Sequence, residues 1–256
     1  NAIDLLASDP FYGGWSTQRF MNVAFVAPPT GVVPPTIIGA IFVYKGDPIT
    51  LTLMAFDPND RTNDYFPGDL FSTGVNLSVG AVWNGTMAGR ATSVGLTSTV
   101  STARGLDLET ILLPPGFETT RKQGSYNIAA SFTHLLVEST AVKGKGLGFY
   151  VKGAVADGNP NVVRGSVVGG IGGEALIPGR PGDAFAIGGF WYNFSNVLQE
   201  TIAPALNFND EIGLETWYRL QLTPWFAVTA DLQVIDPAAG DQPAFAIGAL
   251  RANLKF

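Results

Sequence analysis

Residues 211–222 (EIGLETWYRLQL) decide the fold of this chain, because apolar and polar side chains alternate along them. Leu214 falls on the apolar set of alternate positions and Glu215 on the polar set. A period of two residues predicts a β-strand with one apolar and one polar face. The same alternation returns in residues 225–234 (WFAVTADLQV) and 246–256 (AIGALRANLKF). Three such strands, the last ending on an aromatic residue, are typical of an outer-membrane β-barrel.

The composition favours a membrane barrel over a soluble domain. Of the 256 residues, 14% are charged, compared with about 25% in globular domains. No apolar run reaches the roughly 18 residues that a transmembrane helix needs, so a membrane span must be made of strands. The net charge of −6 argues against a nucleic-acid partner. The lack of cysteine fits an oxidising compartment.

Alternation and turn residues predict twelve antiparallel strands. Their approximate ranges are 19–26, 36–45, 49–57, 75–83, 88–101, 126–134, 147–155, 164–173, 183–193, 211–222, 225–234 and 246–256. Gly46-Asp47-Pro48 predicts a tight turn, and Asn84-Gly85 predicts a two-residue hairpin turn. Short helical turns fit within two of the loops, at residues 106–113 and 197–206.

The lengths of the connections alternate along the chain. Among the connections between predicted strands, long ones fall at odd positions and tight ones at even positions. The long connections are 58–74, 102–124 and 194–210, and the tight ones are 46–48, 84–87 and 223–224. Outer-membrane barrels have long extracellular loops and short periplasmic turns. This segregation predicts a membrane orientation, with every long loop outside and the C-terminal end in the periplasm.

Several stretches carry a resemblance to a known family. They are residues 20–29 (FMNVAFVAPP), 50–64 (TLTLMAFDPNDRTND), 124–134 (GSYNIAASFTH), 168–173 with 178–181, 191–195 (WYNFS) and 222–256. In this order, and over nearly the whole chain, they resemble the carbohydrate-selective porin family, OprB. The resemblance implies a sixteen-stranded barrel in the outer membrane of a Gram-negative bacterium, through which sugars pass by passive diffusion.

The twelve predicted strands are fewer than the resemblance implies. We therefore expect residues 1–256 to form a single porin barrel domain that lacks its N-terminal strands. Asn1–Asp4 carries no signal-peptide pattern, which fits either a removed signal or a chain that begins partway through a longer protein. Twelve strands can also close a smaller barrel. Pairing of the strand at 19–26 with the strand at 246–256 would show that closure.

The first group of candidate site residues lies in the polar loop after residue 56. Its members are Asp57, Asp60, Arg61, Asp64 and Tyr65. One interpretation is a loop that folds inward and narrows the pore, where the carboxylates and the guanidinium bind sugar hydroxyls and the ring of Tyr65 stacks on a sugar. The alternative is a solvated loop held by Asp and Asn side chains that bond to nearby backbone. The acids lack the glycine and glutamate of an EF-hand calcium site, so we predict no metal or cofactor.

The second group lies on the polar face of residues 211–222, which faces the lumen of the predicted barrel. Its members are Glu215, Trp217 and Arg219, with Glu211 on the same face. Charged residues on the same predicted face of other strands add to this group. They are Asp231, Arg251 and Lys255 on the two strands that follow, and Lys152 and Arg164 elsewhere on the wall. These rows either form a ladder of sugar contacts or bridge one another and fill the lumen. An aromatic ring on the polar face is costly unless a sugar stacks on it or it packs under a loop.

An enzyme is not expected. The only histidine, His134, lies on the apolar face of its strand, and Ser131 has the opposite parity, so the two do not form a catalytic pair. Gly169–Gly173 lacks the Lys-Ser/Thr of a phosphate loop, and glycines that let strands approach closely explain it better.

The expected function is passive diffusion of small sugars. The alternatives are a general diffusion porin and a plugged structural or adhesive barrel of the outer membrane. The expected surroundings are outer-membrane lipid and lipopolysaccharide. A homotrimer is consistent with the small outward residues Ala246, Gly248 and Ala252.

Overall fold

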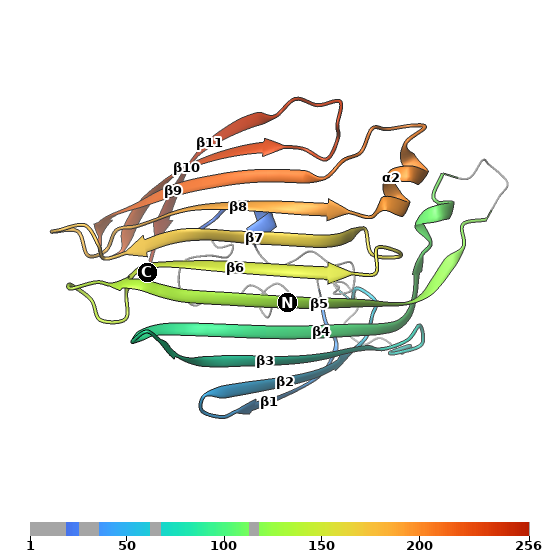
Figure 1. Cartoon of the computed structure of the whole chain (residues 1–256), viewed down its shortest axis with the longest axis horizontal. Helices are drawn as coiled ribbons and strands as arrows, with labels where there is room; N and C mark the ends of the chain where they lie inside the picture. The colour runs from blue at the N-terminus through green and yellow to red at the C-terminus, as the bar shows by residue number, and fades with distance from the viewer. Residues whose placement is uncertain (1–18, 26–35, 62–67, 113–117, 256) are drawn as a thin grey trace.

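The computed structural model describes residues 19–25, 36–61, 68–112 and 118–255. They form one antiparallel sheet in which eleven strands follow each other in chain order (Figure 1). The strands are β1 (Gly39–Lys45), β2 (Ile49–Phe56), β3 (Asn76–Met87), β4 (Arg90–Leu106), β5 (Arg121–Glu138), β6 (Gly146–Ala156), β7 (Val163–Glu174), β8 (Ala184–Phe194), β9 (Glu211–Thr223), β10 (Phe226–Asp236) and β11 (Phe245–Leu254). Three short helices are η1 (Val23–Phe25), η2 (Leu108–Thr110) and α2 (Asn196–Ile202). The predicted all-β antiparallel fold is therefore confirmed.

The predicted strand at residues 19–26 is wrong for its described part. Arg19–Phe25 contains η1 and is not one of the eleven strands of the sheet. Phe20 and Phe25 are fully buried, whereas strand pairing would have turned every second side chain of this stretch toward lipid. The apolar residues of this segment bury two rings inside the molecule instead of forming one face of a strand.

The predicted turn at Gly46–Pro48 is confirmed, and the predicted turn at Asn84-Gly85 is wrong. The N–H of Gly46 donates to the carbonyl oxygen of Ile49 at 3.0 Å, which closes the β1–β2 hairpin. Asn84 and Gly85 lie inside β3 and pair with β4. The chain reverses at Ala88-Gly89, where φ is +51° and +71°. Two successive positive φ angles are what a two-residue hairpin turn requires, and glycine adopts them at little cost.

The predicted segregation of long and short connections is confirmed. The connections at 57–75, 107–120 and 195–210 all lie at the end of the sheet that carries α2, on the right in Figure 1. The turns at 46–48, 88–89 and 224–225 lie at the opposite end. The short helical turns expected in two loops are η2 and α2. The hydroxyl of Ser195 caps α2 by accepting a hydrogen bond from the N–H of Leu198.

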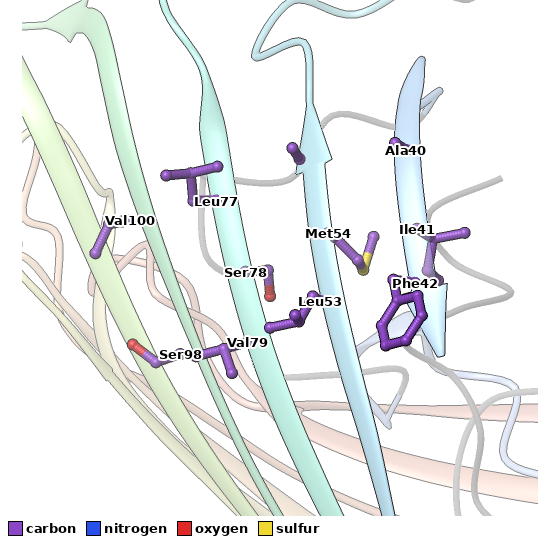
Figure 2. Close-up of a pocket in the computed structure, with 11 residues that line it drawn as sticks. Ala40, Ile41, Phe42, Leu53, Met54, Leu77, Ser78, Val79, Ser98 and Val100 are labelled. Atoms are coloured by element: carbon purple, nitrogen blue, oxygen red, sulfur yellow. The ribbon is translucent and has the colours of Figure 1, made fainter. Parts of the chain in front are cut away.

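The alternation in the sequence separates an outer from an inner face. On β9, Ile212 and Leu214 are 52% and 57% exposed, whereas Glu215 and Trp217 are buried. Along β1 to β4, outward side chains such as Phe42, Leu53 and Val79 line an open apolar groove (Figure 2). Exposed apolar side chains in continuous rows are typical of a strand face that contacts lipid. Within the described residues, no helix is both long and apolar enough to span a membrane.

The sheet is open within the described part of the chain. There β1 pairs only with β2, and β11 pairs only with β10. Every residue of β1 is exposed. The pairing that would have shown a closed twelve-stranded barrel is therefore not present among these residues.

Candidate functional site

The register of the sheet identifies which side chains share its inner face. Residues paired directly across antiparallel strands project to the same side. Glu215 pairs with Gly188, Gly188 with Gly170, and Gly170 with Tyr150. Tyr150 in turn pairs with Thr133, which belongs to β5. These pairs therefore trace one continuous inner face from β9 to β5.

Hydroxyl and amide side chains dominate the inner face of β3, β4 and β5. Its members include Ser78, Asn84, Ser93, Thr97, Thr99, Ser101, Ser125, Asn127, Ser131 and Thr133. We call this set the hydroxyl wall. The hydroxyl group of Thr99 donates to that of Ser78 at 3.0 Å, which links β4 to β3. None of these ten side chains is charged, so the wall offers hydrogen-bond donors and acceptors without a strong field.

Four aromatic side chains cluster on the inner face of β6, β8 and β9. This aromatic wall is made of Tyr150, Phe190, Tyr192 and Trp217. Arg19–Phe25, here called the inner segment, packs against it. The rings of Phe20 and Phe25 stack with centroids 4.1 Å apart and planes 8° from parallel. Phe20 meets the edge of Trp217 at 6.1 Å, and Phe25 meets the edge of Phe190 at 5.8 Å.

Polar contacts also hold the inner segment in place. The Glu215 carboxylate accepts hydrogen bonds from the backbone N–H groups of Met21 and Asn22, the second at 2.9 Å. Three further hydrogen bonds join the segment to side chains on three other strands. The Tyr192 hydroxyl donates to the Ala24 carbonyl oxygen, the Asn22 amide donates to Gln233, and the Arg251 guanidinium donates to the Arg19 carbonyl oxygen.

A glycine makes room for the two stacked rings. An ideal Cβ at Gly188 would lie 2.7 Å from Cζ of Phe20 and 2.8 Å from Cε1 of Phe25. Gly170, its partner on β7, is equally constrained, because a Cβ there would lie 2.6 Å from the carbonyl oxygen of Ile187. The interpretation of Gly169–Gly173 as glycines that permit close strand approach is thereby confirmed.

The inner face thus carries a hydroxyl wall on one side and an aromatic wall on the other, as the lining of a channel would. Comparison with known proteins points to the same kind of protein. Residues 5–256 match the carbohydrate-selective porin family, OprB. The chain belongs to the OprB family. The outer membrane of a Gram-negative bacterium is the location of OprB porins and therefore of this chain. The family is one of channels rather than of enzymes.

Two solved structures share this fold. Pseudomonas putida OprB at high pH is 18% identical, with a TM-score of 0.73 over 84% of this chain and 58% of that protein. The low-pH structure of the same protein is 16% identical, with a TM-score of 0.54 over 83% of this chain and 53% of that protein. The chain therefore spans little more than half the length of this OprB. No match was found among curated protein sequences.

The structure places Glu215 and Trp217 of this OprB-family chain together, but beneath the inner segment. Glu215 is 1% exposed and Trp217 is 4% exposed. Of the two expected positions for an aromatic ring on the polar face, packing under another part of the chain is the one observed. Arg219 is only half-buried, and its guanidinium donates to the carbonyl oxygen of Gly182 at 3.4 Å.

Opposite charges on neighbouring strands pair as predicted for Asp231 and Arg251, which approach to 3.0 Å. Lys152 is buried, with its ammonium group 5.8 Å from the centre of the Tyr150 ring. Arg164 is exposed at the start of β7, where the register with β8 shifts, and so does not join the buried inner wall. The lumen charges are therefore partly engaged with one another.

Asp57 and Arg61 hold the long loop between β2 and β3 together. Asp57 is fully buried and accepts hydrogen bonds from the N–H groups of Asn59 and Phe71, at 2.8 and 2.7 Å. The Arg61 guanidinium lies 3.1 Å from Asp57 and 3.0 Å from Asp69. These contacts match the interpretation of a loop stabilised by acid-to-backbone bonds. Asp60 is exposed, and Asp64 and Tyr65 lie outside the described residues.

The pH at which Asp57 titrates follows from these contacts. Burial acts to raise its pKa, but the N–H groups of Phe71 and Asn59 and the guanidinium of Arg61 outweigh burial and lower the pKa below its ordinary value. A lowered folded-state pKa stabilises the loop above the ordinary pKa of about 3.9, and this stabilisation disappears only as the pH falls through the lowered value. In a carbon-13 NMR titration, the Asp57 carboxyl carbon should have its midpoint below 3.9. A midpoint at or above that value would show that burial outweighs the hydrogen bonds in setting the pKa of Asp57.

Sequence reasoning did not pick out the hydroxyl wall or the inner segment. The signal for the hydroxyl wall is present in residues 91–101 (ATSVGLTSTVS), where four of the five alternate positions from Ser93 to Ser101 carry a hydroxyl group. For the inner segment, the only local signal is the pair Phe20 and Phe25, whose five-residue spacing does not fit one face of a strand.

Proposed function

We propose that this chain forms part of an outer-membrane channel through which small sugars diffuse passively. The observation that carries the proposal is the uncharged hydroxyl wall. A sugar entering the pore must exchange hydrogen bonds with water for others, and Ser, Thr and Asn side chains both donate and accept them. Charged groups at these positions would favour ions over neutral solutes. Membership of the carbohydrate-selective OprB family supports the same substrate class.

The candidate residues contribute to this channel in two ways. We propose that Asp60, Asp64 and Tyr65 in the loop, and Arg219 on the wall, contact passing sugars directly. Asp57, Arg61, Glu215 and Trp217 are buried against other parts of the chain, so their proposed contribution is to shape the pore that the sugar enters. The only histidine, His134, faces outward and bonds to Thr92 at 2.8 Å, so we expect no catalytic activity.

The two sheet edges support the proposal that further strands complete the wall. Backbone N–H and C=O groups without partners are costly in lipid, so a membrane sheet must close. We propose that additional strands lie between β1 and β11, that outer-membrane lipid and lipopolysaccharide contact the outward apolar side chains, and that a homotrimer forms through small outward residues. The small outward residues in question are Ala246, Gly248 and Ala252 of β11.

Liposome swelling with the purified porin tests the proposed function. Monosaccharides and disaccharides should enter faster than amino acids of equal size. Equal rates would indicate a general diffusion porin, and the absence of both swelling and conductance steps in planar bilayers would indicate a plugged barrel.

A charge placed on the hydroxyl wall should change its selectivity. Thr97→Asp is expected to slow sugar entry and to raise the permeability of cations relative to anions, because a fixed carboxylate replaces a neutral hydroxyl group in the lining. Thr97→Ser, which keeps the hydroxyl group, is the matched control and should behave like the wild type. The ion selectivity is read from reversal potentials in a salt gradient. An unchanged reversal potential in Thr97→Asp would show that this wall does not line the conducting path.

A further inference from the structure

We propose that Glu215 is a positioning residue that fixes the inner segment on the aromatic wall and thereby sets the largest sugar that the channel admits. The proposal rests on the channel function proposed above. It concerns how the inner segment is held against the wall of that channel. The sequence alone suggested a different role for Glu215, that of a direct contact with the sugar.

The contacts of Glu215 differ from those of the other buried acid beside it. Asp231 has a counter-charge in Arg251 at 3.0 Å and also accepts from the Gln233 amide. Glu215 lies next to Asp231. It also accepts hydrogen bonds from two consecutive backbone N–H groups of the inner segment, those of Met21 and Asn22. A carboxylate that accepts from two backbone N–H groups binds a stretch of main chain rather than a side chain.

The aromatic contacts alone do not determine where the segment lies. Burial of Phe20 and Phe25 is favourable but has little directional preference of its own. Two adjacent hydrogen bonds to one carboxylate are directional and specify which residues of the segment lie opposite β9. The rings therefore supply adhesion, and Glu215, which accepts two of the five hydrogen bonds described between the segment and the strands, contributes the largest share of the positioning.

The position of the segment determines what a sugar meets on this side of the channel. Glu215 and Trp217 are covered, whereas Val23 and Met21 of the segment are 63% and 37% exposed. The free width of the channel is therefore bounded by the inner segment on one side and by the hydroxyl wall of β3 to β5 on the other. Displacing the segment would widen the path and uncover the aromatic wall.

Cysteine labelling locates the segment in the channel, because the chain contains no native cysteine. Modification of Val23→Cys with a charged thiol reagent should lower the single-channel conductance of the reconstituted porin. Leu214→Cys, which faces outward beside Glu215, is the control and should leave the conductance unchanged on modification. No change in labelled Val23→Cys would place the segment outside the conducting path and overturn the proposal.

Glu215→Gln then tests the positioning role. The amide keeps the shape but offers one acceptor oxygen and turns a donor toward a backbone N–H. The trisaccharide-to-monosaccharide entry ratio should rise severalfold, and the conductance change on labelling Val23→Cys should shrink. Glu211→Gln, on the same face of β9 but bonded to Ala238, should match the wild type. An unchanged size ratio in Glu215→Gln, in a channel that still prefers sugars to amino acids, would overturn this inference and leave the proposed function intact.

A change on the segment itself gives a second test that leaves the barrel wall untouched. Asn22→Pro removes one N–H that Glu215 accepts, and Asn22→Ala keeps it. The proline variant should reproduce the raised size ratio, and the alanine variant should show a smaller change. Equal ratios in the two variants would mean that the backbone bond to Glu215 does not position the segment, even if Glu215→Gln cannot be folded.

Discussion

Replacement of Asp57 with alanine is expected to expose the bond after Arg61 to trypsin roughly a hundredfold faster than in the wild type. The buried carboxylate accepts from the backbone of Asn59 and Phe71 and from the Arg61 guanidinium. Its removal leaves two N–H groups without their acceptor and a largely buried cation without its main counter-charge. Breaking a buried ion pair from one side costs about 3 kcal/mol or more, and such a loss corresponds to the expected change in the population of the open loop.

The measurement is the rate of cleavage of the folded, detergent-solubilised porin at low trypsin concentration. Arg61 is 9% exposed in the intact loop, so cleavage there requires opening. Asp69→Asn is the matched control, because Asp69 pairs with the same guanidinium but its side chain is 62% exposed. Exposed ion pairs contribute little, so the control should be cleaved only slightly faster than the wild type. Similar acceleration in both variants would show that the burial of Asp57 is not what holds the loop.

Asp183→Ala should lower the free energy of unfolding by about 3 kcal/mol, since it removes a buried acceptor that joins the turn between β7 and β8 to β9. The Asp183 side chain is 1% exposed and lies in the turn between β7 and β8. It pairs with Arg180 and accepts from the Tyr218 hydroxyl and the Gln221 N–H, both of β9. Loss of the carboxylate therefore frees this end of β9 from the neighbouring turn.

The pH dependence of this effect follows from the direction of the Asp183 pKa shift. Burial acts to raise the pKa, but the bonds from Arg180, Tyr218 and Gln221 lower it below its ordinary value. The stabilising contribution is therefore complete above about pH 4 and disappears only as the pH falls through the lowered folded-state pKa.

Urea unfolding of the porin in lipid vesicles, followed by tryptophan fluorescence, measures the difference between wild type and Asp183→Ala. The difference should be constant from pH 5 to pH 7, on the basis of an ordinary pKa of about 3.9. Arg180→Ala is the control and should be much milder, because that side chain is 41% exposed. If the alanine variant at position 183 unfolds like the wild type at pH 7, the turn is not anchored through this carboxylate.

Strand positions were predictable because alternation is a property of neighbouring residues. Residues 211–222 correspond closely to β9, and the exposure of Leu214 and burial of Glu215 follow the predicted faces. The turn at Asn84-Gly85 was misplaced because the end of a hairpin depends on how far the partner strand continues. Here β3 extends to Met87, and Ala88-Gly89 supplies the positive φ angles.

The inner segment shows the opposite case. Its apolar residues led to the prediction of a short strand, and the only local sign against that strand is the five-residue spacing of Phe20 and Phe25, which places the two rings on opposite strand faces. The contact that holds the segment on the inner face joins Met21 to Glu215, which are 194 positions apart. Only the curvature and register of the intervening strands bring these two residues together.

The sequence by itself determined the all-β antiparallel class, the inner or outer face of most strand residues, the end that carries the long loops and the resemblance to OprB porins. All four follow from short-range periodicity and from turn and loop residues, which act on adjacent positions. The tertiary structure decided which inward residues are free to meet a solute. Glu215 and Trp217 lie on the predicted face but bind the inner segment, and Asp57 and Arg61 bind each other. The physical reason is that a polar side chain inside a barrel must find a partner, and that partner is set by the packing of distant strands and segments.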